Sequence, residues 1–256
     1  MYHAQCEYEK AAFAFEEGLL CAQRSRYTRL DILISIGLGD LFTELEDFGM
    51  AEQNYRHAVE AFQGMNDRFL SHSLNFAKIN LALLKKDVPA AYGFLEDAKS
   101  SMEKSQSNYE NGFLSLLKGR LYLLEGNAGS AVREIKRAET HFSEDGRDLE
   151  VSITRLWLAA ASCQNGGTTE VVKLIKDLYG DRGRISHAVL VAVHQARNWL
   201  GGLQKETENA RVIRDLFAQA DRLANRMPDI RRQLRRQAVR DRRLARRAQR
   251  SGNRPA

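Results

Sequence analysis

Cysteine, proline and long apolar segments are scarce in this chain. Its three cysteines, Cys6, Cys21 and Cys163, are scattered and odd in number, which excludes a disulfide scaffold and predicts reduced thiols in a cytoplasmic protein. Eighteen glycines in 256 residues exclude a collagen-like chain. Apolar runs such as Ala188 to Val193 are too short to span a membrane, and the N-terminal residues lack the basic start and apolar centre of a signal peptide.

Motifs that support catalysis are also missing from the sequence. There is no phosphate-binding loop, no HExxH zinc motif and no paired-cysteine motif. Gly37 and Gly39 belong to an expected helix without a preceding strand, which favours helix packing over a dinucleotide site. His187 and His194 share one face of an expected helix, where half a metal site or a pH sensor is the alternative to packing or surface histidines. We therefore predict that the protein is not an enzyme and uses no cofactor or metal.

Positive charge is concentrated at the C-terminal end. Residues 226–256 contain twelve arginines and two aspartates, a net charge of +10, whereas the whole chain carries +6. The first 225 residues are therefore mildly acidic, at −4. Since the tail lacks aromatic residues that could stack on bases, we expect at most a weak, non-specific contact with nucleic acid there.

A forty-residue repeat runs through most of the chain. Apolar or small residues recur at spacings of three, four and three, which form one face of an α-helix. Four sets share this register: Tyr8, Ala11, Phe15 and Gly18; Phe48, Ala51, Tyr55 and Ala58; Val88, Ala91, Leu95 and Ala98; Ala128, Ala131, Ile135 and Ala138. A fifth set, which begins at Thr168, fits more weakly.

A second series of residues precedes the first and repeats at the same interval. It contains Gly39, Ile79, Gly119 and Ala159, with Leu41, Leu81, Leu121 and Ala161 two residues later. Each unit is therefore expected to hold two helices, and the small residues let the two axes approach closely. Because neither helix can bury its apolar face alone, the units must stack into an all-α solenoid with almost no strand.

Two units resemble the tetratricopeptide repeat. Leu38, Gly39, Phe42, Phe48, Ala51, Tyr55 and Ala58 match its pattern, and so do Gly119, Tyr122, Gly126, Ala131, Ile135 and Ala138. The unit between them departs from it, with Lys78 and Ile79 where Leu and Gly would stand. The period exceeds the usual value of about 34 residues, and such longer helices are similar to the effector-binding superhelix of the MalT-like bacterial transcription activators. The resemblance implies a right-handed superhelix over residues 1–180.

The two ends of the chain fit the repeat less well. Tyr8 to Gly18 matches the second helix of a repeat unit, but the first helix of that unit would need residues before Met1. The chain is therefore either a fragment of a longer protein or begins with a capping helix. A helical extension is expected over residues 181–234, with an apolar heptad seam in which Pro228 starts a second helix. Residues 235–256 should form an arginine-rich, partly disordered tail, which serves as a connector, as a helix facing an acidic partner or as the nucleic-acid contact.

Candidate binding residues lie on the first helix of each unit, because these helices line the concave face of a solenoid. The polar positions are Asp40, Asn80 and Arg120, and the apolar positions beside them are Phe76, Leu83 and Leu123. This mixture suits a protein segment or a small effector, unless the long helices close the groove. We expect a binding module that forms the sensor or scaffold portion of a bacterial transcription regulator, or else a stand-alone adaptor.

Overall fold

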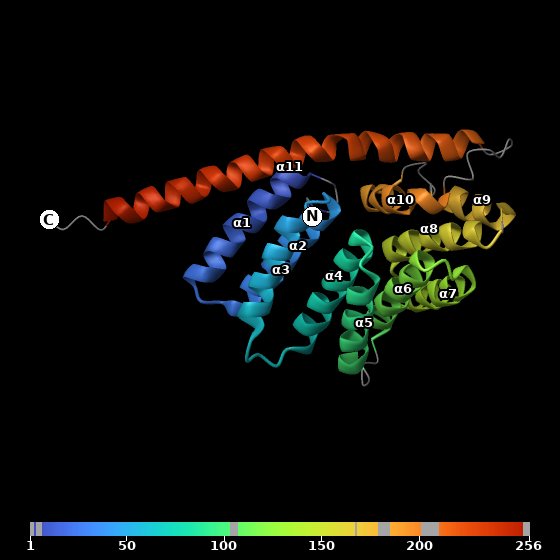
Figure 1. The fold of residues 1–256 in the computed structure, drawn as a ribbon, viewed down its shortest axis with the longest axis horizontal. Coiled ribbons are helices and arrows are strands. Elements are labelled where there is room, and N and C mark those ends of the chain that lie inside the picture. The colour runs from blue at the N-terminus through green and yellow to red at the C-terminus, as the bar shows by residue number, and fades with distance from the viewer. Residues whose placement is uncertain are drawn as a thin grey trace.

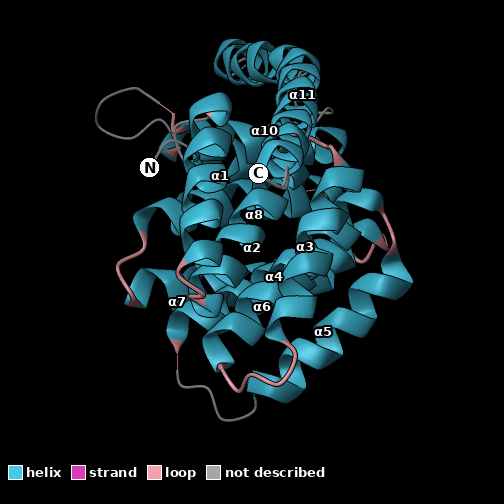
Figure 2. Ribbon diagram, turned by 90° about the vertical axis from the view of Figure 1, so that its left-hand side faces the viewer, coloured by secondary structure: helices cyan, strands magenta, loops and turns pink. Residues whose placement is uncertain are grey.

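The structure, a computed structural model, describes residue 3 and residues 7–102, 107–166, 168–178, 185–200 and 210–252. Within these ranges the chain forms eleven α-helices and no strand (Figure 2). The helices are α1 (Tyr8–Arg24), α2 (Thr28–Glu44), α3 (Phe48–Phe62), α4 (Arg68–Lys85), α5 (Val88–Met102), α6 (Asn108–Leu124), α7 (Ala128–Glu144), α8 (Asp148–Gln164), α9 (Thr168–Asp177), α10 (His187–Leu200) and α11 (Ala210–Gly252).

The helix boundaries follow the forty-residue period. Helices α2, α4, α6 and α8 begin at residues 28, 68, 108 and 148, and α3, α5, α7 and α9 begin at 48, 88, 128 and 168. Tight turns end α1, α2, α4, α6, α7 and α8, where a left-handed residue lies at positions 26, 46, 86, 126, 146 and 166. Glycine fills the last three of these positions, where the absence of a side chain removes the steric penalty of a positive φ.

In two of the units a glycine lies where the two helices cross. A Cβ atom on Gly39 would lie 2.2 Å from the Tyr55 ring, and one on Gly119 would lie 2.5 Å from Ile135. In the α4–α5 unit, Ile79 replaces the glycine and Leu95 stands at the position of Tyr55, and both are buried in one cluster. The α4–α5 unit therefore accommodates a large side chain at the position where the tetratricopeptide pattern has glycine.

Helix pairs stack through the body of the molecule. From α1 to α9 each helix packs against the next, and α2, α4, α6 and α8 also contact one another in succession. One buried apolar cluster extends from α1 to α11, and a smaller one joins α4, α5 and α6. This all-α arrangement is the one predicted, and it is consistent with a solenoid.

The C-terminal extension folds back over the helix pairs. Helix α10 packs on α8, and α11 runs along one side of the molecule past α10 and α1 (Figure 1). The seam of α11 is buried, with every member at most 6% exposed: Ile213, Leu216, Ala220, Leu223, Met227, Ile230 and Leu234.

The prediction that Pro228 separates two helices is wrong. Helix α11 is continuous through Pro228 and extends to Gly252, so the first part of the predicted tail is helical, while residues 253–256 lie outside the described ranges. Pro228 is on the exposed side of α11. Water can therefore hydrate the carbonyl group that proline leaves without a hydrogen-bond donor, which makes the interruption less costly.

Candidate functional site

Two of the predicted site residues meet on neighbouring helices. Arg120 of α6 donates a hydrogen bond from Nη1 to Oδ1 of Asn80 on α4, at 2.7 Å. The residues are forty positions apart, so the repeat register explains why they face each other. Arg120 is buried, with 8% of its surface exposed. Burial lowers the pKa of the Arg120 guanidinium to about 10, which leaves it charged at neutral pH.

A small pocket, which we name the inner pocket, lies beside Arg120. The guanidinium carbon of Arg120 is 4.4 Å from the centre of the Trp157 ring, and Trp199 of α10 meets Trp157 edge-on at 6.0 Å. The pocket has a volume of about 60 Å³ and is also lined by Lys86, Gln195, Asn198 and three leucines. Helix α10 forms one of its walls, so the C-terminal extension closes part of the groove that the sequence predicted.

The predicted apolar residues occupy different places. Leu83 lines the inner pocket. Leu123 belongs to the core, with 1% of its surface exposed. Phe76 stacks on Phe113 with ring centres 6.0 Å apart, inside an aromatic cluster. Of the three, the structure therefore brings only Leu83 to the Asn80–Arg120 pair.

Asp40 faces the contact between α2 and α3 instead. The Tyr55 hydroxyl donates a 2.7 Å hydrogen bond to Oδ1 of Asp40 and lies 3.0 Å from the Thr43 hydroxyl. Burial raises the pKa of Asp40 to about 6, although the hydrogen bond from Tyr55 opposes this shift. Asp40 is thus part of the packing within one helix pair and is not joined to Arg120.

Sequence reasoning missed the α10 residues of the inner pocket. Gln195, Asn198 and Trp199 follow the point where the repeat fades, so no register connects them to Arg120. The only signal was the amphipathic pattern of residues 185–200, which predicts a buried face without saying what covers it.

A larger cavity, which we name the outer groove, opens between α3, α4 and α5. Its volume is about 330 Å³, and its lining includes apolar Val59 and Phe94, basic Arg56, Lys78 and Lys85, and acidic Glu52 and Asp87. Lys78 Nζ lies 4.2 Å from the centre of the Phe94 ring. Partial burial lowers the pKa of Lys78, against a weaker opposing effect of Asp97. Arg56 and Lys78 form no ion pair within the described ranges, whereas Lys85 pairs with Glu52.

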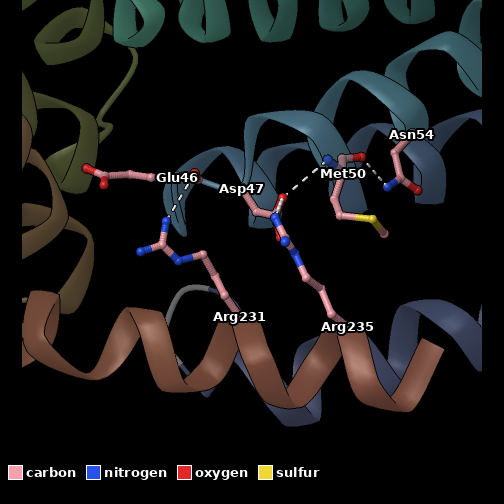
Figure 3. Close-up of polar contacts among 6 residues, drawn as sticks. All are labelled: Glu46, Asp47, Met50, Asn54, Arg231 and Arg235. Carbon is pink, nitrogen blue, oxygen red and sulfur yellow. Dashed lines mark hydrogen bonds and ion pairs between the residues drawn. The ribbon is translucent and has the colours of Figure 1, made fainter. Parts of the chain in front are cut away.

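A set of polar contacts, which we name the latch, pins α11 to the turn between α2 and α3 (Figure 3). Arg235 donates two hydrogen bonds of 2.6 Å to the carboxylate of Asp47, whose side chain is 1% exposed. Asp47 also caps α3 by accepting a hydrogen bond from the Met50 amide at 3.4 Å. Arg231 donates to the backbone carbonyl of Glu46 at 3.2 Å.

Helix α10 is tied to the same turn and to α11. His194 Nε2 lies 3.1 Å from the Glu46 carboxylate. Arg197 forms an ion pair with Asp221 of α11. Arg235 and its neighbours are therefore part of the folded body, although the sequence placed Arg235 at the start of the tail.

The chain matches no known protein family and no curated protein sequence. Among the helices of the described residues, none combines the length and the apolar character needed to cross a membrane. The resemblance to tetratricopeptide proteins therefore rests on the residues of this chain and on the forty-residue spacing of its helices.

Proposed function

We propose that this chain is a partner-binding module and forms the sensor or scaffold portion of a bacterial transcription regulator. In this proposal its helix pairs are tetratricopeptide-like units of a right-handed superhelix, similar to the effector region of MalT-like activators. Stacked helix pairs of regular length support the proposal, because such repeats present extended surfaces that bind other molecules. No catalytic role is proposed.

The outer groove is the observation that carries this function. Its volume lies at the lower end of the range for ligand pockets, about 300–1,000 Å³. Apolar Val59 and Phe94 adjoin Arg56 and Lys78, two cations that form no ion pair in the described ranges. The two carboxylates of the lining are already engaged, Glu52 by Lys85 and Asp87 by the Ala90 amide. This combination suits a protein segment in which an apolar side chain stands next to Asp or Glu. The apolar side chain would lie on Phe94, and the carboxylate would reach Lys78.

Selection of random peptides displayed on phage, with the full chain as bait, tests this function. We expect enrichment of peptides that carry an apolar residue beside Asp or Glu. Lys78→Glu should weaken their binding at least about tenfold, since it replaces an attraction with a repulsion. Lys99→Glu, which reverses an exposed charge on α5 outside the groove, should leave binding unchanged. Enrichment of peptides without acidic residues, or equal binding by both variants, would contradict the proposal.

A stand-alone adaptor is the second form that the same binding function can take. Sequencing the transcript upstream of Met1 distinguishes the two forms. A DNA-binding or ATPase segment in the same reading frame supports the regulator, whereas an in-frame stop codon just before Met1 supports the adaptor.

A further inference from the structure

Arg120 carries a charge in a place where a charge is unfavourable. Buried charged groups are normally paired with an opposite charge, because removal from water is costly. Within the described residues, Arg120 has one hydrogen-bond partner, the neutral Asn80, and one aromatic neighbour, Trp157. No described carboxylate neutralises it. The guanidinium therefore lines the inner pocket as a buried cation without a counterion among the residues that the structure describes.

The other polar groups of the inner pocket are also suited to an anion. Lys86, the C-cap residue of α4, adds a second cation that forms no ion pair in the described part of the chain. Gln195 and Asn198 of α10 contribute side-chain amides, whose NH₂ groups are hydrogen-bond donors. Two cations and two amides thus surround a space beside two tryptophan rings.

We propose that the inner pocket binds a small oxyanion, the carboxylate or phosphate group of an effector, with Arg120 as the principal ligand. The planar guanidinium presents parallel N–H groups that match two oxygens of such an anion. A volume of about 60 Å³ admits one oxyanion and not a whole nucleotide. This site is separate from the outer groove, so its test does not depend on peptide binding.

Binding at the inner pocket has a structural consequence. Arg120 and Lys86 belong to the helix pairs, whereas Gln195, Asn198 and Trp199 belong to α10. An oxyanion that contacts both sides would hold α10 against α6. It should therefore stabilise the closed arrangement of the C-terminal extension as well as neutralise Arg120.

Intrinsic tryptophan fluorescence measures this binding directly, because the chain has two tryptophans and both line the pocket. The full chain is titrated with sodium phosphate and, separately, with sodium acetate, with sodium chloride at equal ionic strength as the reference. We expect a saturable fluorescence change and a higher melting temperature with phosphate or acetate but not with chloride. The anion that produces the effect identifies the group. No saturable change with either anion would overturn the proposal.

Three variants connect the signal to the pocket. Arg120→Met keeps a long side chain but removes the charge, and it should weaken anion binding at least about tenfold. Lys86→Gln alters an exposed side chain at the end of α4, so it should fold normally and bind about threefold or more weakly. Lys99→Gln removes the same charge from α5 at a residue that does not line the inner pocket, and it should bind like the unaltered chain. If Arg120→Met does not fold, Lys86→Gln decides, and a titration curve identical to that of the unaltered chain refutes the site.

Discussion

Replacing Arg235 with alanine should loosen α11 and destabilise the whole chain. The substitution removes two hydrogen bonds of 2.6 Å to Asp47, whose carboxylate is almost completely buried. Within the described residues, the Met50 amide is then the remaining hydrogen-bond donor to that carboxylate. Since α11 contacts both α10 and α1, the loss at this point weakens the closure of the C-terminal extension over the first helices.

The expected loss of stability is moderate. A hydrogen bond to a charged group contributes about 1.5–3 kcal/mol, but the Arg235 side chain is 61% exposed and water replaces part of the interaction. We therefore expect the free energy of unfolding to fall by about 1–2 kcal/mol. For a chain of this size such a change lowers the melting temperature by about 2–8 °C.

Thermal unfolding followed by circular dichroism measures this effect. Arg236→Ala is the matched control, because it removes the same charge from the neighbouring residue, which is exposed. Asp47→Asn should behave like Arg235→Ala, and the double variant should lose less than the sum of the two single losses, because both act on one interaction. Equal melting temperatures for Arg235→Ala and Arg236→Ala would show that the latch does not stabilise the fold.

The latch should also depend on pH. Burial alone would raise the pKa of Asp47, but its hydrogen bonds with Arg235 and the Met50 amide reverse this effect, so the pKa lies below the usual 3.8. A carboxyl group with a lowered pKa stabilises the folded state above its unfolded pKa and loses this contribution as pH falls through the folded value. The difference in stability between the unaltered chain and Asp47→Asn should therefore be constant near neutral pH and shrink below about pH 4.

Three further predictions follow from the packing, the buried carboxyl group and the tail. Ala131→Leu should lower stability by about 1–3 kcal/mol through overpacking at a helix crossing, whereas the exposed Arg133→Leu on the same helix should change it little in a thermal melt. Asp40 has a raised pKa of about 6, so its contribution to stability should decline as pH rises from about 4 to 6, and Asp40→Asn should abolish this part of the pH dependence of the melting temperature. Deletion of residues 238–256 should remove weak DNA binding in a low-salt gel shift and preserve the melting temperature, because Arg235 remains; sequence-specific binding at physiological salt would contradict this.

The forty-residue register predicted the helix pairs because residues forty apart occupy equivalent positions in stacked units. The same reasoning brought Asn80 and Arg120 together. It did not extend to Trp199, since α10 lies beyond the repeat, and an apolar face indicates burial without identifying the surface that covers it. The role of Arg235 was hidden for a similar reason. Its partner, Asp47, lies 188 residues away in sequence. No local sequence pattern distinguishes Arg235 from the other arginines of residues 226–256, which number twelve in all.

Pro228 illustrates the opposite error, in which a local rule was given too much weight. Proline interrupts one hydrogen bond of a helix, but the buried seam on both sides of Pro228 holds α11 together. Tertiary packing therefore outweighed the local preference for a break. Asp40 shows a further limit of reasoning from the repeat register. The register placed it in a row with Asn80, but its side chain accepts a hydrogen bond from the Tyr55 hydroxyl of its own unit.

A charge-swap titration tests most directly the claim that the outer groove binds an apolar and acidic segment. A selected peptide and a version with its acidic residue changed to lysine are each titrated, by fluorescence anisotropy, against the unaltered chain and against Lys78→Glu. We predict that the acidic peptide prefers the unaltered chain and that the lysine peptide prefers Lys78→Glu. If both peptides bind the two proteins in the same order of affinity, Lys78 does not recognise the acidic residue and the outer groove is not the binding site.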